Sequence, residues 1–220
     1  MKKSVLLLLI MGFSILYSQE IPNTPTNTVK RIHALLKQYD ENSPNNKKIK
    51  DEVNSYFDLL GMAQRAIIDH WNKMTKKQQD EYISLMFKLL EKAVYKDTQE
   101  NLQKGVVKYK AERKIGKRAA VVTDIYIKTE DMTIENEFRM RNNSEKWVVE
   151  DILIDGASLT EDYRSQFNKI ISQYGIDKNK DSLFPRIRKA ISEDKDEWRK
   201  NWKAKREKPK KQTRPTLLEK

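Results

Sequence analysis

The sequence predicts an α+β protein, with helices packed on one side of a four- to five-stranded antiparallel sheet. Three observations lead to this prediction. Apolar residues recur at helical spacing up to about residue 95, and they alternate with polar residues between 107 and 154. Helical spacing then returns after residue 158. Helices that are segregated from a run of strands are typical of the α+β class.

The first 18 residues are typical of a cleavable secretory signal peptide. Lys2 and Lys3 precede an unbroken apolar run at 5–10, and the small residue Ser18 comes before a polar stretch. The apolar segment is short for a membrane span, and an uncleaved anchor is the alternative interpretation. The chain has no cysteine, which excludes a lipid-modified N-terminus, disulfides and thiol chemistry. We therefore expect an exported, soluble protein.

The mature chain divides by composition into three parts. We expect a linker at 19–28, a folded domain at 29–192 and a basic, disordered tail at 193–220. The net charge of the chain is +12, of which +2 lies in the signal segment and +8 between 198 and 214. Residues 19–197, which are the linker, the folded domain and the acidic start of the tail, together carry only +2. The high isoelectric point is thus a property of the tail, which argues against a nucleic-acid-binding domain.

Four segments with helical spacing precede the predicted sheet. The helix at 59–71 contains Gly61, where we expect an interruption or a turn. Thr75 with Gln78 fits a capping box, which satisfies free amide groups at a helix start. The helix that follows has an apolar face wider than a surface helix needs. The four segments are residues 29–39, 47–57, 59–71 and 75–95.

Alternating polarity then predicts a meander of strands, followed by two more helices. The segment 132–141 alternates strictly, as a half-buried antiparallel strand does. Ser158 and Glu161 form a second capping box, and Gly175 is placed to cap the same helix at its end. A last amphipathic segment spans 183–191. The predicted strands are residues 107–111, 119–127, 132–141 and 147–154.

The residues offer little for catalysis. His33 and His70 are the only histidines, and we interpret both as surface or interface residues. Without cysteine they make no metal-binding motif, and no glycine-rich phosphate loop is present. Glu150 and Asp151 are neighbours on a strand, so we expect them to point to opposite faces and not to share a site. We predict no catalytic residues, no metal and no cofactor.

Large, flexible apolar side chains are abundant on the faces that look inward. Methionine packs adaptably, so these faces fit either a filled core or a cavity. Sequence spacing does not separate the two. The residues are Phe57, Met62, Met86, Phe87, Met132, Phe138, Met140 and Phe167.

Several short motifs together carry a resemblance to a known family. Tyr56-Phe57-Asp58 begins the pattern, and the segment 120–125 follows it as a central strand. The strongest part is Trp-Val-Val-Glu-Asp-Ile at 147–152, followed by Ile-Asp-Gly-Ala-Ser-Leu at 154–159. In order and spacing the sequence resembles the MlaC family, also called the toluene-tolerance auxiliary family, over roughly residues 29–191. Ala157 and the basic tail depart from the family pattern.

This resemblance implies an NTF2-related fold with an apolar lipid cavity between the sheet and the helices. It implies a soluble periplasmic carrier that moves single phospholipids and so maintains the lipid asymmetry of the outer membrane. The partners it implies are an outer-membrane lipoprotein complex and an inner-membrane ABC transporter with an MCE-domain protein. No nucleic acid is expected as a partner. The basic tail has two interpretations, a solvated end or a transient contact with an anionic membrane surface.

We hypothesise a set of lipid-binding residues that line this cavity, chosen by helical spacing and strand alternation. Tyr163 and Arg164 are candidates for the headgroup contact. The lining residues are Phe57, Met62, Ala66, Met86, Leu90, Val122, Ile134, Phe138, Trp147, Val149, Phe167 and Ile170.

Three other functions compete with phospholipid carriage. An NTF2-like enzyme acting on a small apolar substrate would need a buried Asp or Glu with a raised pKa. A related carrier could hold another lipid, such as a hopanoid. Nucleic-acid binding would rest on Trp198 and Trp202 of the basic tail stacking on bases, and export argues against it.

Overall fold

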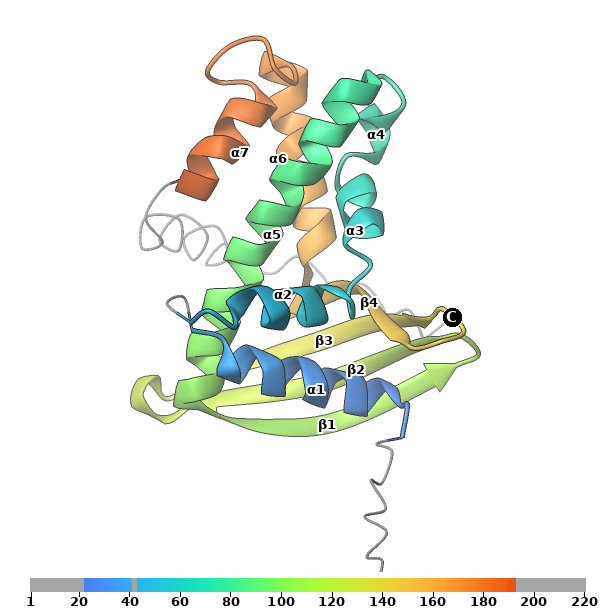
Figure 1. Ribbon diagram of the computed structural model, residues 1–220, viewed down its shortest axis with the longest axis vertical. Coiled ribbons are helices and arrows are strands. Elements are labelled where there is room, and N and C mark those ends of the chain that lie inside the picture. The colour runs from blue at the N-terminus through green and yellow to red at the C-terminus, as the bar shows by residue number, and fades with distance from the viewer. Residues whose placement is uncertain (1–21, 41–42, 193–220) are drawn as a thin grey trace, which may run out of the picture.

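The computed structural model describes residues 22–40 and 43–192 (Figure 1). It contains an antiparallel sheet, a pair of helices on one sheet face and an upright lobe of helices beside the sheet. The expected signal peptide at 1–18 and the expected tail at 193–220 lie outside the described residues.

The sheet has five strands in sequence order, β1-β2-β3-β4-β5, and every neighbouring pair is antiparallel. This order confirms the predicted α+β class with an antiparallel sheet. Asp131 has a positive φ of 45° and closes the short 3-10 turn between β2 and β3. The elements are β1 (Gly105–Ile115), β2 (Arg118–Ile127), η1 (Lys128–Glu130), β3 (Met132–Asn142), β4 (Trp147–Ile154) and β5 (Ala157–Ser158).

Two helices cover one face of the sheet, α1 (Pro25–Gln38) and α2 (Asn46–Asn54). α1 begins inside the segment 19–28 that we expected to be a linker. The reason is local: Thr24 caps the helix by accepting from the Asn27 amide, and Pro25 stands at the first turn, where a missing N–H costs nothing. The proline that suggested a linker thus starts a helix.

The remaining helices form the lobe. They are α3 (Leu59–Ala66), α4 (Ile68–Trp71), α5 (Lys76–Lys104), α6 (Leu159–Tyr174) and α7 (Leu183–Ser192). The capping box of Thr75 and Gln78 is present at the start of α5. Gly175 caps α6 with a φ of 78°, a conformation that favours glycine.

Two helix boundaries differ from the prediction. The break in 59–71 falls at Ile67, whose φ of −133° leaves the helical region, and not at Gly61, which lies inside α3. α5 continues to Lys104, although its apolar periodicity fades after Tyr95. The added turns are rich in Gln, Glu and Lys, which favour helices without needing a buried face.

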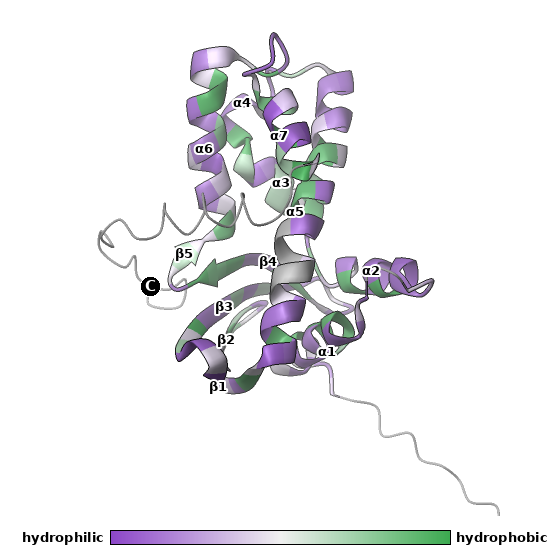
Figure 2. Cartoon of the chain, turned by 90° about the vertical axis from the view of Figure 1, so that its left-hand side faces the viewer, coloured by the Kyte–Doolittle hydropathy of each residue, from purple (hydrophilic) through white to green (hydrophobic). Residues whose placement is uncertain are grey.

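The buried apolar side chains form two separate clusters. The sheet cluster lies between α1, α2, the end of α5 and the sheet, and Trp147 and Ile32 are among its most buried members. The lobe cluster lies among α3, α5, α6 and α7, around Tyr82 and Phe184. Phe57 is partly buried against both clusters. Figure 2 shows β4 largely in green, the apolar strand at the junction of lobe and sheet.

Candidate functional site

The chain before α3 is joined directly to β4. Phe57 and Val149 form an isolated parallel bridge. The Asp58 amide donates to the Val149 carbonyl at 2.9 Å, and the Val149 amide donates to the Tyr56 carbonyl at 2.8 Å. These bonds place Phe57 where the two apolar clusters meet. The motif Tyr-Phe-Asp of the sequence analysis is therefore the connection between lobe and sheet.

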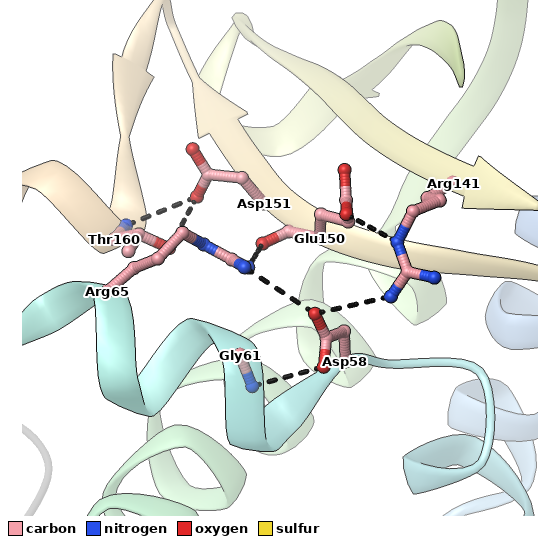
Figure 3. Close-up of polar contacts among 7 residues, drawn as sticks. All are labelled: Asp58, Gly61, Arg65, Arg141, Glu150, Asp151 and Thr160. Atoms are coloured by element: carbon pink, nitrogen blue, oxygen red, sulfur yellow. Dashed lines mark hydrogen bonds and ion pairs between the residues drawn. The ribbon is translucent and has the colours of Figure 1, made fainter. Parts of the chain in front are cut away.

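Charged side chains reinforce this connection (Figure 3). Arg65 of α3 donates to the Glu150 carbonyl at 2.6 Å, and Arg141 of β3 donates to the Glu150 carboxylate at 2.8 Å. The Asp58 carboxylate lies between the two guanidinium groups, at 3.5 Å from Arg65 and 3.7 Å from Arg141. The same carboxylate caps α3 by accepting from the Gly61 amide at 3.0 Å. A Cβ at Gly61 would collide with this carboxylate, which explains the glycine inside α3.

Asp151 of β4 anchors a second lobe helix to the sheet. Its carboxylate accepts from the Ser158 hydroxyl at 2.5 Å, the Thr160 hydroxyl at 2.9 Å and the Thr160 amide at 3.2 Å. Ser158 in turn caps α6 by accepting from the Glu161 amide at 3.1 Å. A carboxylate at a helix N-terminus also interacts favourably with the helix dipole. The sequence motif around 147–159 therefore positions α6.

The expectation that Glu150 and Asp151 point to opposite faces is wrong. Asp151 pairs with Arg139 and Val149 with Met140, so Glu150 is an extra residue in a β-bulge. The Glu150 carboxylate reaches Arg141, which lies on the same face of β3 as Arg139. Both carboxylates thus lie on one sheet face, where that of Asp151 holds α6 to the sheet and that of Glu150 pairs with Arg141 within the sheet.

Eleven of the twelve predicted lining residues lie in or against the two clusters. Phe57 contacts both, as described above. Members of the lobe cluster or packed against it are Met62, Ala66, Met86, Leu90, Phe167 and Ile170. Members of the sheet cluster or packed against it are Ile134, Phe138, Trp147 and Val149. Their contact with a lipid stays a prediction.

Val122 is the twelfth residue and belongs to neither cluster. Its neighbours Val121 and Thr123 are fully buried on the face of β2 that α1 covers. Val122 therefore lies on the opposite face, where its register partners are Ala111 and Glu137. Strand alternation in the sequence identifies two faces but not which one the helices cover.

The two headgroup candidates lie side by side on α6 but in different surroundings. Tyr163 is buried in the lobe cluster. The Arg164 guanidinium is paired with the Asp69 carboxylate at 2.9 and 3.0 Å, and Asn168 donates to the same carboxylate at 2.8 Å. These hydrogen bonds, from Arg164 first, lower the pKa of Asp69 below its ordinary value. Arg164 therefore ties α6 to α4.

A row of polar side chains crosses the sheet cluster. Tyr109, Thr123 and Asn136 are register partners on three adjacent strands, so they share the face that α1 covers. His33 of α1 lies above this row, and its Nδ1 is hydrogen-bonded to the Tyr109 hydroxyl at 3.0 Å. Burial, and then the charge of Lys37, lowers the pKa of His33 to about 4. Within the described residues, His33 Nε2 and the Thr123 hydroxyl are buried without a hydrogen-bond partner.

The arrangement of titratable groups bears on the enzyme alternative. No Asp or Glu is among the buried residues of the described part of the chain. Within residues 22–40 and 43–192, no group of three or more His, Cys, Asp or Glu is arranged to hold a metal ion.

None of the helices described is both long and apolar enough to cross a bilayer.

Sequence reasoning missed the residues that join lobe and sheet. Asp58 had a local signal, because an Asp whose carboxylate accepts from the amide three residues later is a typical helix cap. Arg65 and Arg141 had none, because their partner Glu150 belongs to another segment of the chain.

Comparison with known proteins gives the following. The sequence matches the family described as MlaC protein over residues 26–183. No curated protein matches the chain. Among solved structures, the fold resembles the phospholipid-binding protein from Ralstonia solanacearum, determined in complex with a phospholipid. The two chains are 20% identical with a TM-score of 0.60, and the match covers 76% of this chain and 94% of that one. At this identity the likeness establishes a shared fold.

Proposed function

Because the chain belongs to the MlaC family, we propose that it binds one phospholipid and carries it through the periplasm as a soluble protein. The observation that carries the proposal is the family match over residues 26–183, which includes the whole junction of lobe and sheet. The phospholipid held by the Ralstonia solanacearum protein of the same fold supports it. The family implies an outer-membrane complex and an inner-membrane complex as the two partners between which the lipid moves.

The chemistry of such a carrier agrees with the residues present. Two acyl chains of about 30 methylenes would cost about 24 kcal/mol in water, at about 0.8 kcal/mol each. The protein must supply apolar surface for them, and it needs no reactive group. We place the chains where the lobe cluster adjoins the sheet cluster, with Phe57 at the boundary.

The test of carriage is native mass spectrometry of the protein purified from its own periplasm. We expect about one phospholipid for each chain. A hopanoid in its place would favour the related-carrier alternative. An empty protein that also fails to extract phospholipid from vesicles would contradict carriage altogether.

Ile170 offers a test of the binding region. It is only partly buried against the lobe cluster, so the fold should tolerate a change there. Ile170→Glu should reduce the co-purified phospholipid about tenfold or more, because a carboxylate beside an acyl chain loses its hydration. The matched control is Ile68→Glu on α4, where the side chain is 53% exposed. Equal lipid loading in both variants, with both folded, would exclude Ile170 from the site.

A further inference from the structure

The β1–β2 turn gathers positive charge at one end of the sheet. Residues 113–118 read Arg-Lys-Ile-Gly-Lys-Arg, with four basic side chains and no acidic one. Ile115 and Arg118 are the last paired residues, so Gly116 and Lys117 form a two-residue hairpin loop. Gly116 has a φ of 57°, which such a loop commonly requires at its first position. All six residues are exposed.

The geometry keeps two of these four charges, those of Lys117 and Arg118, available. Neither Lys117 nor Arg118 forms an ion pair within the described part of the chain. The nearest acid on the same strand, Glu112, accepts instead from the Thr26 amide at 2.9 Å and the Thr26 hydroxyl at 2.6 Å. The Asn142 amide donates to the Lys117 carbonyl at 2.8 Å, which fixes the loop against β3.

An apolar side chain stands in the middle of this basic loop. Ile115 is 56% exposed, and a Cβ built on the neighbouring Gly116 would meet nothing within 4 Å. The loop tip is therefore open to its surroundings. Basic residues that flank an exposed apolar residue suit the interface of an anionic bilayer, where the charges meet headgroups and the apolar side chain enters the acyl boundary.

We propose that the hairpin tip, residues 113–118, binds the surface of anionic membranes. Figure 1 shows β1 and β2 running to this end of the sheet, away from the end where α5 leads into β1. Ile115, Lys117 and Arg118 belong to neither apolar cluster, so the contact they make is separate from the proposed lipid-binding region. Lys114 lies nearer to that region, with its ammonium group 5.3 Å from the centre of the Trp147 ring. It adds a membrane contact in the folded domain to any that the basic tail makes.

The test is co-sedimentation of the full-length chain with vesicles of phosphatidylglycerol and phosphatidylcholine. Lys117→Gln with Arg118→Gln should weaken binding about 30-fold, at about 1 kcal/mol for each basic residue near the surface. Ile115→Ser should weaken it about fivefold, the equivalent of about 1 kcal/mol for a half-exposed isoleucine. Vesicles of pure phosphatidylcholine should bind none of the three proteins, the unchanged chain or either variant.

The control variant is Lys48→Gln with Lys77→Gln, which removes the same charge from exposed sites on α2 and α5. It should bind within twofold of the unchanged chain. The tail is identical in every variant, so its contribution cancels. Unchanged binding by the hairpin variant, an equal loss in the control, or no binding of the unchanged chain to anionic vesicles would each overturn the proposal. Lipid loading measured by mass spectrometry should not change, so this test and the test of carriage can fail independently.

Discussion

The stability of the protein should fall on mild acidification because of His33. This side chain is 3% exposed and lies between Tyr109 and Phe138, at ring-centroid distances of 5.8 and 5.5 Å. Burial lowers its pKa in the folded protein to about 4, against 6.5 for an unperturbed histidine. Between these values the unfolded chain binds a proton that the folded chain does not. Stability is therefore full above about pH 6.5 and falls as the pH decreases toward 4.

The size of this loss follows from the two pKa values. At about 1.36 kcal/mol per pH unit, the whole interval corresponds to about 3 kcal/mol. At pH 5 the expected loss from His33 is about 2 kcal/mol, a large part of the stability of an ordinary domain. The assay is urea unfolding at pH 7 and pH 5 for the unchanged chain and for His33→Gln, whose amide does not titrate. The unchanged chain should lose about 2 kcal/mol more than the variant.

His70→Gln is the control, since His70 is the other histidine of the chain and lies outside both clusters. That variant should keep the pH dependence of the unchanged chain. If His33→Gln loses as much stability as the unchanged chain between pH 7 and pH 5, His33 is not held neutral in the fold and the reasoning fails.

Two further variants test other polar contacts by thermal or urea unfolding. Asp151→Ala should destabilise the protein by about 2 kcal/mol, because three donors from Ser158 and Thr160 lose a charged acceptor at the start of α6; a loss under 0.5 kcal/mol would mean that water replaces the carboxylate. Thr123→Val should stabilise it by about 1 kcal/mol, because the variant removes a buried hydroxyl that lacks a partner. A destabilised Thr123→Val protein would instead indicate that an ordered water or a ligand group satisfies the hydroxyl.

Local patterns in the sequence predicted most of the elements. The helical spacing of 29–39 and the alternation of 132–141 each correspond to an element of the fold, because an amphipathic segment must turn its apolar side to a core. Helix caps such as Thr75 and Gly175 were predictable because a cap depends only on residues within one turn of the helix end. The start of α1 was predicted wrongly because Pro25 suggested a linker, and the end of α5 because its apolar periodicity fades after Tyr95.

The candidate site was predictable only in part. Helical spacing and strand alternation identified eleven residues that the fold brings into or against its two clusters. Val122 was assigned to the same set, but it lies on the opposite face of the sheet. The faces of Glu150 and Asp151 were also misjudged, because a β-bulge depends on the register with β3. One inserted residue exchanges the two sheet faces for every later residue of the strand, and no local sequence pattern indicates where such an insertion occurs.

By itself, the sequence determined the α+β class, the order of the elements and, through its motifs, the MlaC family. It also contained the basic run at 113–118, which a net charge of the whole domain conceals. Only the tertiary structure decided that this run is an open hairpin tip, that His33 is buried, and that Asp58 joins Arg65 to Arg141. The burial of His33 and the contact of Asp58 with Arg141 depend on segments distant along the chain, and the exposure of the tip depends on which surfaces the rest of the fold covers. Sequence periodicity reports only how one segment divides its own faces.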